Sequence, residues 1–218
     1  MRRELLKPTM INTIIDVNHD NSLEFPKLQE AGIVAIIHKA TEGKTFKDPL
    51  YKARKKEALE LGFLWGAYHF SSGDDPVVQV KNFLSVENGE DPKILIALDF
   101  EGSTSGADMT LEQAHQFVSE VKKRTGRFPV VYGGNLIREN VKGEDKILKN
   151  CPLWYARFRE VPVGIPKKTW PQFTLHQYTD GELGPEPRKT PGSSGADRNR
   201  FLGTVKQLRA AWPFTAAA

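Results

Sequence analysis

Short apolar runs recur along the chain, and polar or aromatic residues follow most of them. Residues 34–37 and 94–98 are continuous apolar runs rather than alternating ones. Continuous runs are typical of strands that are buried on both faces, as in a parallel sheet covered by helices. The pattern predicts eight strands, at residues 13–17, 33–40, 64–70, 94–101, 128–132, 153–157, 173–178 and 196–201.

Helical segments lie between several of these runs. Thr110 followed by Gln113 is a capping-box signature, apolar residues follow it at helical spacing, and Gly126 is a natural stop. Further helices are predicted over residues 49–61, from residue 76 onward, and over residues 203–212.

Strand and helix thus alternate over a chain of 218 residues, which predicts a parallel α/β fold. Eight strands favour an irregular (β/α)8 barrel of the TIM type, in a single domain, over an open sheet. We expect an N-terminal extension at residues 1–9, the barrel at residues 10–212 and a C-terminal tail at residues 213–218.

Composition excludes several classes of protein. The net charge is +4 without a long block of like charge, so no nucleic-acid partner is expected. The single cysteine, Cys151, excludes an intramolecular disulfide framework. A membrane span needs about 20 apolar residues, which no run approaches, so we expect no stable membrane association. Metal-ligand spacings and phosphate-binding loops are not evident, so no metal or cofactor is predicted. A monomer is the default expectation.

Polar residues collect where the predicted strands end, and the C-terminal strand ends carry the chemistry of a TIM-type barrel. Four of these residues are acids: Asp16, Asp99, Glu101 and Asp197. The others are aromatic or hydrogen-bonding residues that suit sugar binding: Lys39, Tyr68, Tyr132, Trp154, Tyr155, Gln177, Tyr178 and Asn199. Acids ringed by aromatic side chains predict a pocket for a glycan.

The strongest single motif is Asp99-Phe100-Glu101. Residues i and i+2 of a strand share a face with Cα atoms roughly 7 Å apart, so the carboxyl groups can reach the ~5–9 Å separation used in glycoside hydrolysis. Two like charges ~6 Å apart repel by roughly 3 kcal/mol, enough to separate their pKa values by about two. One acid should therefore keep its proton near neutral pH. We assign it to Glu101, whose longer side chain reaches further toward a leaving-group oxygen.

Six segments in order along the chain resemble glycoside hydrolase family 25, the N-acetylmuramidase-type lysozymes: residues 15–17, 38–43, 66–70, 98–102, 153–156 and 196–201. The resemblance implies an irregular barrel that cleaves the β-1,4 bond between N-acetylmuramic acid and N-acetylglucosamine in peptidoglycan, with retention of configuration. It also implies that Glu101 is the general acid/base, Asp99 its partner, and Asp16 and Asp197 the other acids of the site.

Two routes to retention stay open. Asp99 could attack the anomeric carbon, or the 2-acetamido group of the substrate could attack while Asp99 orients it. We favour the second, because a short side chain on the strand of the acid is poorly placed to reach the opposite face of the sugar. The alternatives in function are a non-catalytic cell-wall glycan-binding protein on the same barrel and a chitinase-like hexosaminidase.

The expected partner is the peptidoglycan glycan strand. Only Leu5 and Leu6 follow the basic start of the chain before Lys7, so no classical signal peptide is predicted. We therefore expect synthesis in the cytoplasm and action on the cell wall after holin-type release, as for an endolysin, or after specialised secretion.

Overall fold

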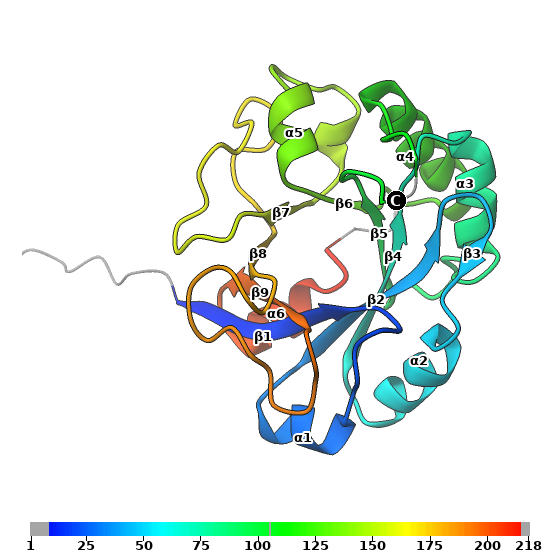
Figure 1. Ribbon diagram of the computed structural model, residues 1–218. Helices are drawn as coiled ribbons and strands as arrows, with labels where there is room; N and C mark the ends of the chain where they lie inside the picture. Colours follow the sequence, from blue (N-terminus) through cyan, green and yellow to red (C-terminus); the bar gives the residue numbers. More distant parts are fainter. Residues whose placement is uncertain (1–8, 105, 215–218) are drawn as a thin grey trace, which may run out of the picture.

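The apolar runs form a closed ring of strands in the computed structural model, which describes residues 9–104 and 106–214 (Figure 1). Eight strands make the ring: β1 (Met10–Val17), β2 (Ala35–Glu42), β4 (Leu64–Phe70), β5 (Leu95–Asp99), β6 (Val130–Gly133), β7 (Leu153–Ala156), β8 (Leu175–Thr179) and β9 (Asp197–Leu202). The two-residue strand β3 (Phe46–Lys47) pairs with the end of β2. The predicted (β/α)8-like barrel is confirmed. The ends of the prediction, residues 1–8 and 215–218, lie outside the described residues.

One strand departs from the predicted parallel order. The ring runs β1-β9-β8-β7-β6-β5-β4-β2 and closes through the parallel β1–β2 pair, but β9 is antiparallel to both of its neighbours. A parallel return usually needs a helical crossover. The Gly- and Pro-rich connection at residues 180–196 forms no helix, so the chain turns back and β9 runs the opposite way. The barrel is therefore mixed rather than parallel throughout.

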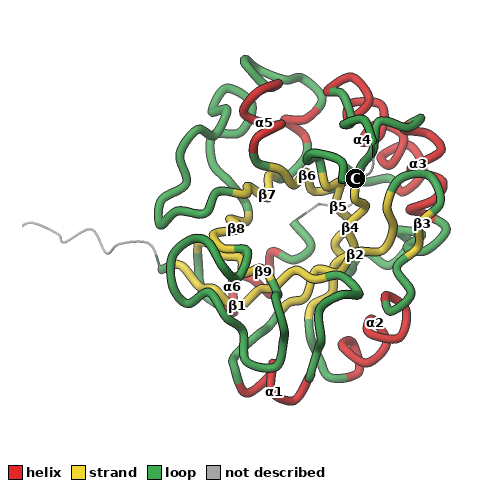
Figure 2. Tube along the Cα trace, viewed as in Figure 1, coloured by secondary structure: helices red, strands yellow, loops and turns green. Residues whose placement is uncertain are grey.

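The helices that cover the outside of the ring lie between residues 25 and 140 (Figures 1 and 2). They are α1 (Phe25–Glu30), α2 (Tyr51–Glu60), α3 (Pro76–Leu84), α4 (Leu111–Thr125) and α5 (Asn135–Asn140), with a 3₁₀ turn at Leu148–Asn150. The predicted capping box is confirmed, because the Thr110 side chain accepts from the Gln113 amide and α4 ends at Gly126 with φ of +77°. Loops rather than helices lie outside β7 to β9.

Side chains alternate between two apolar layers along each strand. On β2, Ile36 packs outward against the helices and Ile37 packs into the barrel interior. The helix α6 (Val205–Ala211) packs against the interior layer where β5 begins, and Trp212 donates from Nε1 to the Lys93 carbonyl at 3.1 Å. Phe214 stacks on Phe201, so the predicted tail is partly packed on the barrel. The interior is thus filled at this end, and the carboxyl ends of the parallel strands remain open for a site.

Among the residues that the structure describes, none of the helices has the length and apolar character needed to cross a membrane.

Candidate active site

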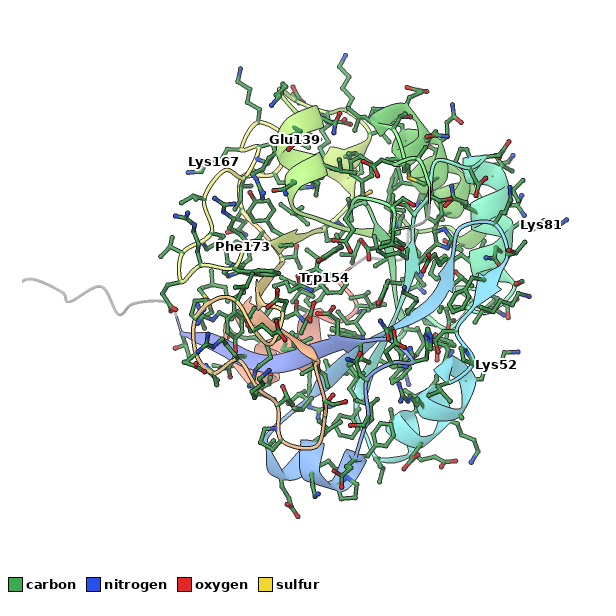
Figure 3. The ribbon with its side chains drawn as sticks, viewed as in Figure 1. Lys52, Lys81, Glu139, Trp154, Lys167 and Phe173 are labelled. Atoms are coloured by element: carbon green, nitrogen blue, oxygen red, sulfur yellow. The ribbon has the colours of Figure 1, made fainter. Side chains whose placement is uncertain are left out.

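A cavity of about 270 Å³ lies at the open end of the barrel. It brings together the four predicted acids and five of the other predicted residues: Asp16, Asp99, Glu101 and Asp197, with Lys39, Tyr68, Tyr132, Trp154 and Gln177. Trp154 points toward the middle of the ring (Figure 3). Segments that are far apart in the sequence therefore converge on one polar cavity.

Three lining residues were not predicted: Asn18, Phe70 and Thr104. Phe70 is two residues after Tyr68 on β4, so the alternation of strand side chains could have placed it on the same face. Asn18 and Thr104 lie beyond the ends of β1 and β5, in segments where no periodic pattern indicates the direction of a side chain.

The structure does not bring Tyr155 or Tyr178 to the cavity. Each follows an inward-facing residue, Trp154 or Gln177, and therefore points out of the barrel. The Tyr155 hydroxyl donates to the Val163 carbonyl at 2.9 Å, and the Tyr178 hydroxyl donates to the Pro187 carbonyl at 2.7 Å. Both tyrosines, which were predicted to contact the sugar, are instead buried and hold loops against the barrel wall.

The reversed direction of β9 explains how Asp197 reaches the site. Asp197 is the first residue of β9, and in a parallel strand it would lie at the closed end of the barrel. Because β9 is antiparallel to β1, Asp197 pairs with Asp16 near the end of β1. Two carboxylates from the two ends of the chain thus face one another at the mouth.

Two buried amides organise these carboxylates. Gln177 donates from Nε2 to both oxygens of Asp16 at 3.1 Å and to Asp197 Oδ2 at 3.0 Å, and its Oε1 accepts from the Tyr132 hydroxyl at 2.8 Å. Asn199 donates to Asp16 Oδ2 at 2.7 Å and accepts from Trp154 Nε1 at 2.6 Å. Asn199 therefore lies behind Asp16 rather than on the cavity surface, and it acts as a positioning residue.

Asp99 and Glu101 lie where β5 ends. The strand stops at Asp99 rather than at the predicted residue 101, but the Phe100 amide still donates to the Tyr132 carbonyl at 2.9 Å. Phe100 packs outward, so Asp99 and Glu101 keep the same inward face. Asp99 is 5% exposed, and its Oδ1 has no hydrogen-bond partner among the described residues.

Burial raises the pKa of every acid in the cavity. It raises the pKa of Glu101 to about 7, where the negative charge of Asp16 adds to the effect. The pKa of Asp16 rises to about 6, because burial outweighs the hydrogen bonds from Asn199 and Gln177. Burial and then the charge of Glu101 raise the pKa of Asp99 well above its ordinary value.

Burial, followed by the charge of Asp16, likewise raises the pKa of Asp197, to about 9. The sequence predicts a raised pKa for one acid, whereas enclosure in the cavity raises the pKa of all four. Near neutral pH the free site therefore holds more than one proton.

Lys39 supplies the positive charge of the cavity. Its Nζ donates to Glu42 at 2.9 Å and lies 4.6 Å from the centre of the Phe70 ring. Its charge lowers the pKa of both Asp99 and Glu101, against the effect of burial. Within the described part of the chain, groups of three or more His, Cys, Asp or Glu residues suited to a metal ion are absent.

A mixed (β/α)8 barrel with paired carboxylates at the carboxyl ends of its strands defines the class of the protein as a barrel glycoside hydrolase. The sequence pattern of "Glycosyl hydrolases family 25" matches residues 15–186, and the chain belongs to this family. It is therefore a glycoside hydrolase.

Similar proteins agree with this assignment. The chain is 31% identical to lysozyme M1 of Streptomyces globisporus over 216 residues, which cover 90% of this chain and 69% of that protein. It resembles the crystal structure of a bacterial lysozyme from Streptomyces coelicolor with a TM-score of 0.77 and 27% identity, covering 94% and 97% of the two chains. A family GH25 lysozyme from Aspergillus fumigatus gives a TM-score of 0.77 and 28% identity, covering 93% and 98%.

Proposed function

We propose that the protein is an N-acetylmuramidase that hydrolyses the β-1,4 bond between N-acetylmuramic acid and N-acetylglucosamine in bacterial peptidoglycan, with retention of configuration. The observation that carries the proposal is the gathering of Asp16, Asp99, Glu101 and Asp197 on one cavity in which every carboxyl pKa is raised. Membership of family 25 and the similarity to lysozymes support the choice of substrate.

Glu101 is the general acid in this proposal. A pKa of about 7 keeps a large fraction of Glu101 protonated at neutral pH and makes the carboxylate a competent base after the proton has left. Glu101 gives its proton to the glycosidic oxygen as the bond from that oxygen to the anomeric carbon breaks. The leaving sugar departs as an alcohol.

The substrate's own 2-acetamido group is the nucleophile. Its carbonyl oxygen attacks the anomeric carbon and forms an oxazolinium ion, whose N–H carries positive charge. The buried Oδ1 of Asp99 is an unused acceptor among the described residues, which suits it to that N–H. With substrate bound, the Asp99 and Glu101 pair holds one proton, which lies on Glu101, so that Asp99 is the carboxylate that accepts from the N–H.

Hydrolysis then restores the site. Glu101, now a carboxylate, takes a proton from a water molecule as the water oxygen attacks the anomeric carbon and the oxazolinium ring opens. Two inversions at one carbon give net retention. The network of Gln177 and Asn199 holds Asp16 and Asp197 beside this reaction, where the charge of Asp16 stabilises positive charge at the anomeric centre.

The aromatic side chains on the cavity give the sugar apolar surfaces. Tyr68, Phe70 and Trp154 line the same cavity as the acids. The Trp154 ring is fixed by its hydrogen bond to Asn199 and by contact with Tyr132, whose ring centre lies 4.6 Å away. A rigid aromatic wall positions the sugar ring without further ordering on binding.

The test is release of reducing ends from purified peptidoglycan by the wild type and by Glu101→Gln. After borohydride reduction, mass analysis should find muramitol at the new ends. N-Acetylglucosaminitol in its place would indicate a hexosaminidase of different bond specificity. Binding without any bond cleavage by the wild type would overturn the proposal in favour of a glycan-binding protein.

A separate experiment tests the nucleophile. A thiazoline analogue of muramic acid imitates the oxazolinium ion and should inhibit competitively. A covalent sugar trapped on Asp99 by an activated 2-fluoro substrate would instead assign the attack to Asp99.

A further inference from the structure

A second cavity, of about 370 Å³, adjoins the active site and shares Glu101 and Tyr132 with it. Its remaining lining includes Gly102 after β5, Asn135 and Arg138 of α5, Ala156 at the end of β7, and Arg157 and Arg159 beyond it. We call it the arginine groove. Asp16, Asp99 and Asp197 line only the active-site cavity, whereas Glu101 lines both cavities. The groove therefore begins at the general acid.

Three guanidinium groups give the groove its charge. Arg138, on α5, donates to the Tyr155 hydroxyl at 3.3 Å and to the Asn135 side chain. Arg157 and Arg159 follow β7, and their backbones are fixed because Arg157 N donates to the Gln177 carbonyl at 3.0 Å and Arg159 N donates to the Arg157 carbonyl at 2.7 Å. The positions of these arginines are thus tied to the barrel wall that also carries Gln177.

The arginine charges are not neutralised within the described residues. No carboxylate among those residues lies within 4.0 Å of Arg138, Arg157 or Arg159, whereas the nearby Glu160 is paired with Arg200 at 3.0 Å. The Nε atom of Arg157 is buried and has no hydrogen-bond partner among the described residues. Glu101 is the one acid among the residues that line the groove. A buried guanidinium donor without an acceptor is costly, and an anionic ligand would satisfy it.

We propose that the arginine groove binds a carboxylate on a muramyl residue of the leaving-group side of the glycan strand. This inference rests on the proposed function. Glu101 protonates the oxygen that joins the two sugars, and the sugar under attack lies with Asp99 and Asp16. The strand beyond that oxygen must therefore extend past Glu101, where the groove begins.

The chemistry of the groove matches such a strand. Muramic acid carries a lactyl group that ends in a carboxylate or in a peptide stem with its own carboxylates, whereas N-acetylglucosamine carries no charge. The planar fork of an arginine binds a carboxylate through two parallel hydrogen bonds. The groove thus gives the enzyme a contact that distinguishes peptidoglycan from an uncharged glycan of the same linkage.

The experiment compares three soluble glycan strands of equal length. The first keeps its peptide stems, the second has the stems removed by an amidase so that each lactyl carboxylate is free, and the third has those carboxylates converted to methyl esters. For Arg157→Gln/Arg159→Gln we expect kcat/KM to fall about tenfold, mainly through KM, on at least one charged strand and to change less than twofold on the esterified strand. A loss on the first strand alone assigns the contact to stem carboxylates, and a loss on the second assigns it to the lactyl group.

The matched control removes two positive charges elsewhere. Lys52 on α2 and Lys81 on α3 are exposed and lie away from α5, whose Glu139 is labelled (Figure 3). Lys52→Gln/Lys81→Gln should leave the discrimination between charged and esterified strands unchanged. The single variant Arg159→Gln, at an exposed position, should show part of the effect if the double variant is unstable.

Equal losses on all three strands, or the same loss in the lysine control, would overturn the inference. Absence of cleavage of every strand by the wild type would contradict the proposed function instead. In that case, binding of the three strands to Glu101→Gln, measured by calorimetry, still decides whether the groove recognises a carboxylate.

Discussion

Asp16 and Asp197 are paired residues of the antiparallel strands β1 and β9, and one nitrogen atom, Nε2 of Gln177, donates to both carboxylates. Gln177 is 1% exposed, so these bonds form away from bulk water. The shared donor holds two acids close together without neutralising either one. The site depends on this buried amide as well as on the acids themselves.

Gln177→Met keeps the size of the side chain and removes the shared donor. Because the hydrogen bond from Gln177 lowers the pKa of Asp16, we expect that pKa to rise above about 6. We expect kcat to fall about 10- to 100-fold, since buried acids without a donor lose their fixed geometry. Carbon-detected NMR titration of the carboxyl groups and steady-state kinetics measure the two effects. The exposed Gln172→Met is the control, and an unchanged Asp16 titration would contradict the prediction.

Glu101→Gln should lower kcat by about 10²–10⁴-fold, because a positioned general acid contributes a factor of that size. Binding of a glycan fragment, measured by calorimetry, should change little. Glu139→Gln on the outer helix α5 is the matched control and should retain full activity. A loss of binding that equals the loss of activity would show that Glu101 acts in substrate binding rather than in proton transfer.

Activity should decline on the alkaline side of neutrality. In the proposed mechanism the acid form of Glu101 is the active one, and its folded-state pKa is raised to about 7. As the pH rises through that value, the general acid loses its proton, so kcat/KM should fall about tenfold for each further pH unit. A pH–rate profile on soluble glycan strands measures the position of this limb. A flat profile from pH 6 to pH 9 would contradict the assignment.

Two neighbouring charges should move the alkaline limb in opposite directions. Asp16 raises the pKa of Glu101, so Asp16→Asn should shift the limb to lower pH; Lys39 lowers that pKa, so Lys39→Met should shift it to higher pH. The control is Glu57→Gln, on the exposed face of α2, whose pH–rate profile should match that of the wild type. Shifts in the same direction for both variants would indicate a change of structure instead of charge.

The acids should also lower stability at alkaline pH. The pKa of Asp197 is raised from 3.8 to about 9 on folding, so the stability linked to its neutral form is lost as the pH rises from the unfolded value through the folded one. Asp197→Asn, which keeps an oxygen for the Gln177 donor, should therefore raise Tm at pH 8 more than at pH 5. A gain of 1 kcal/mol corresponds to about 2–4 °C for a chain of this size. Calorimetric scans at both pH values measure the difference, and a gain that does not depend on pH would contradict the prediction.

Sequence reasoning located the barrel because its strands are apolar on both faces and its longest helix carries a full capping box. It located Asp16, Asp99 and Glu101 because side chains at the ends of parallel strands meet at one end of a barrel. It did not anticipate that β9 is reversed, although this reversal is what brings Asp197 to the mouth. The direction of a strand depends on how the preceding connection packs, which no local pattern records.

The positions of Tyr155 and Tyr178 outside the cavity have a different cause. Both residues lie near strand ends, but the alternation of side chains turns them outward once Trp154 and Gln177 face inward. Because side chains alternate along a strand, placing Gln177 in the cavity would have excluded Tyr178 from the cavity lining. The arginine groove could not be predicted because part of its lining lies in the irregular loop after β7. Tertiary contacts such as that between Tyr155 and Val163 set the course of this loop.

The pairing of β1 with β9 has a consequence for biosynthesis. Asp197 and Asn199 are made late, and until that last strand docks against the first the barrel stays open and Asp16 lacks the amide of Asn199. A growing polypeptide on the ribosome therefore has no complete hydrolytic centre. Under the proposed function, fragments that end before β9 are therefore expected to be inactive.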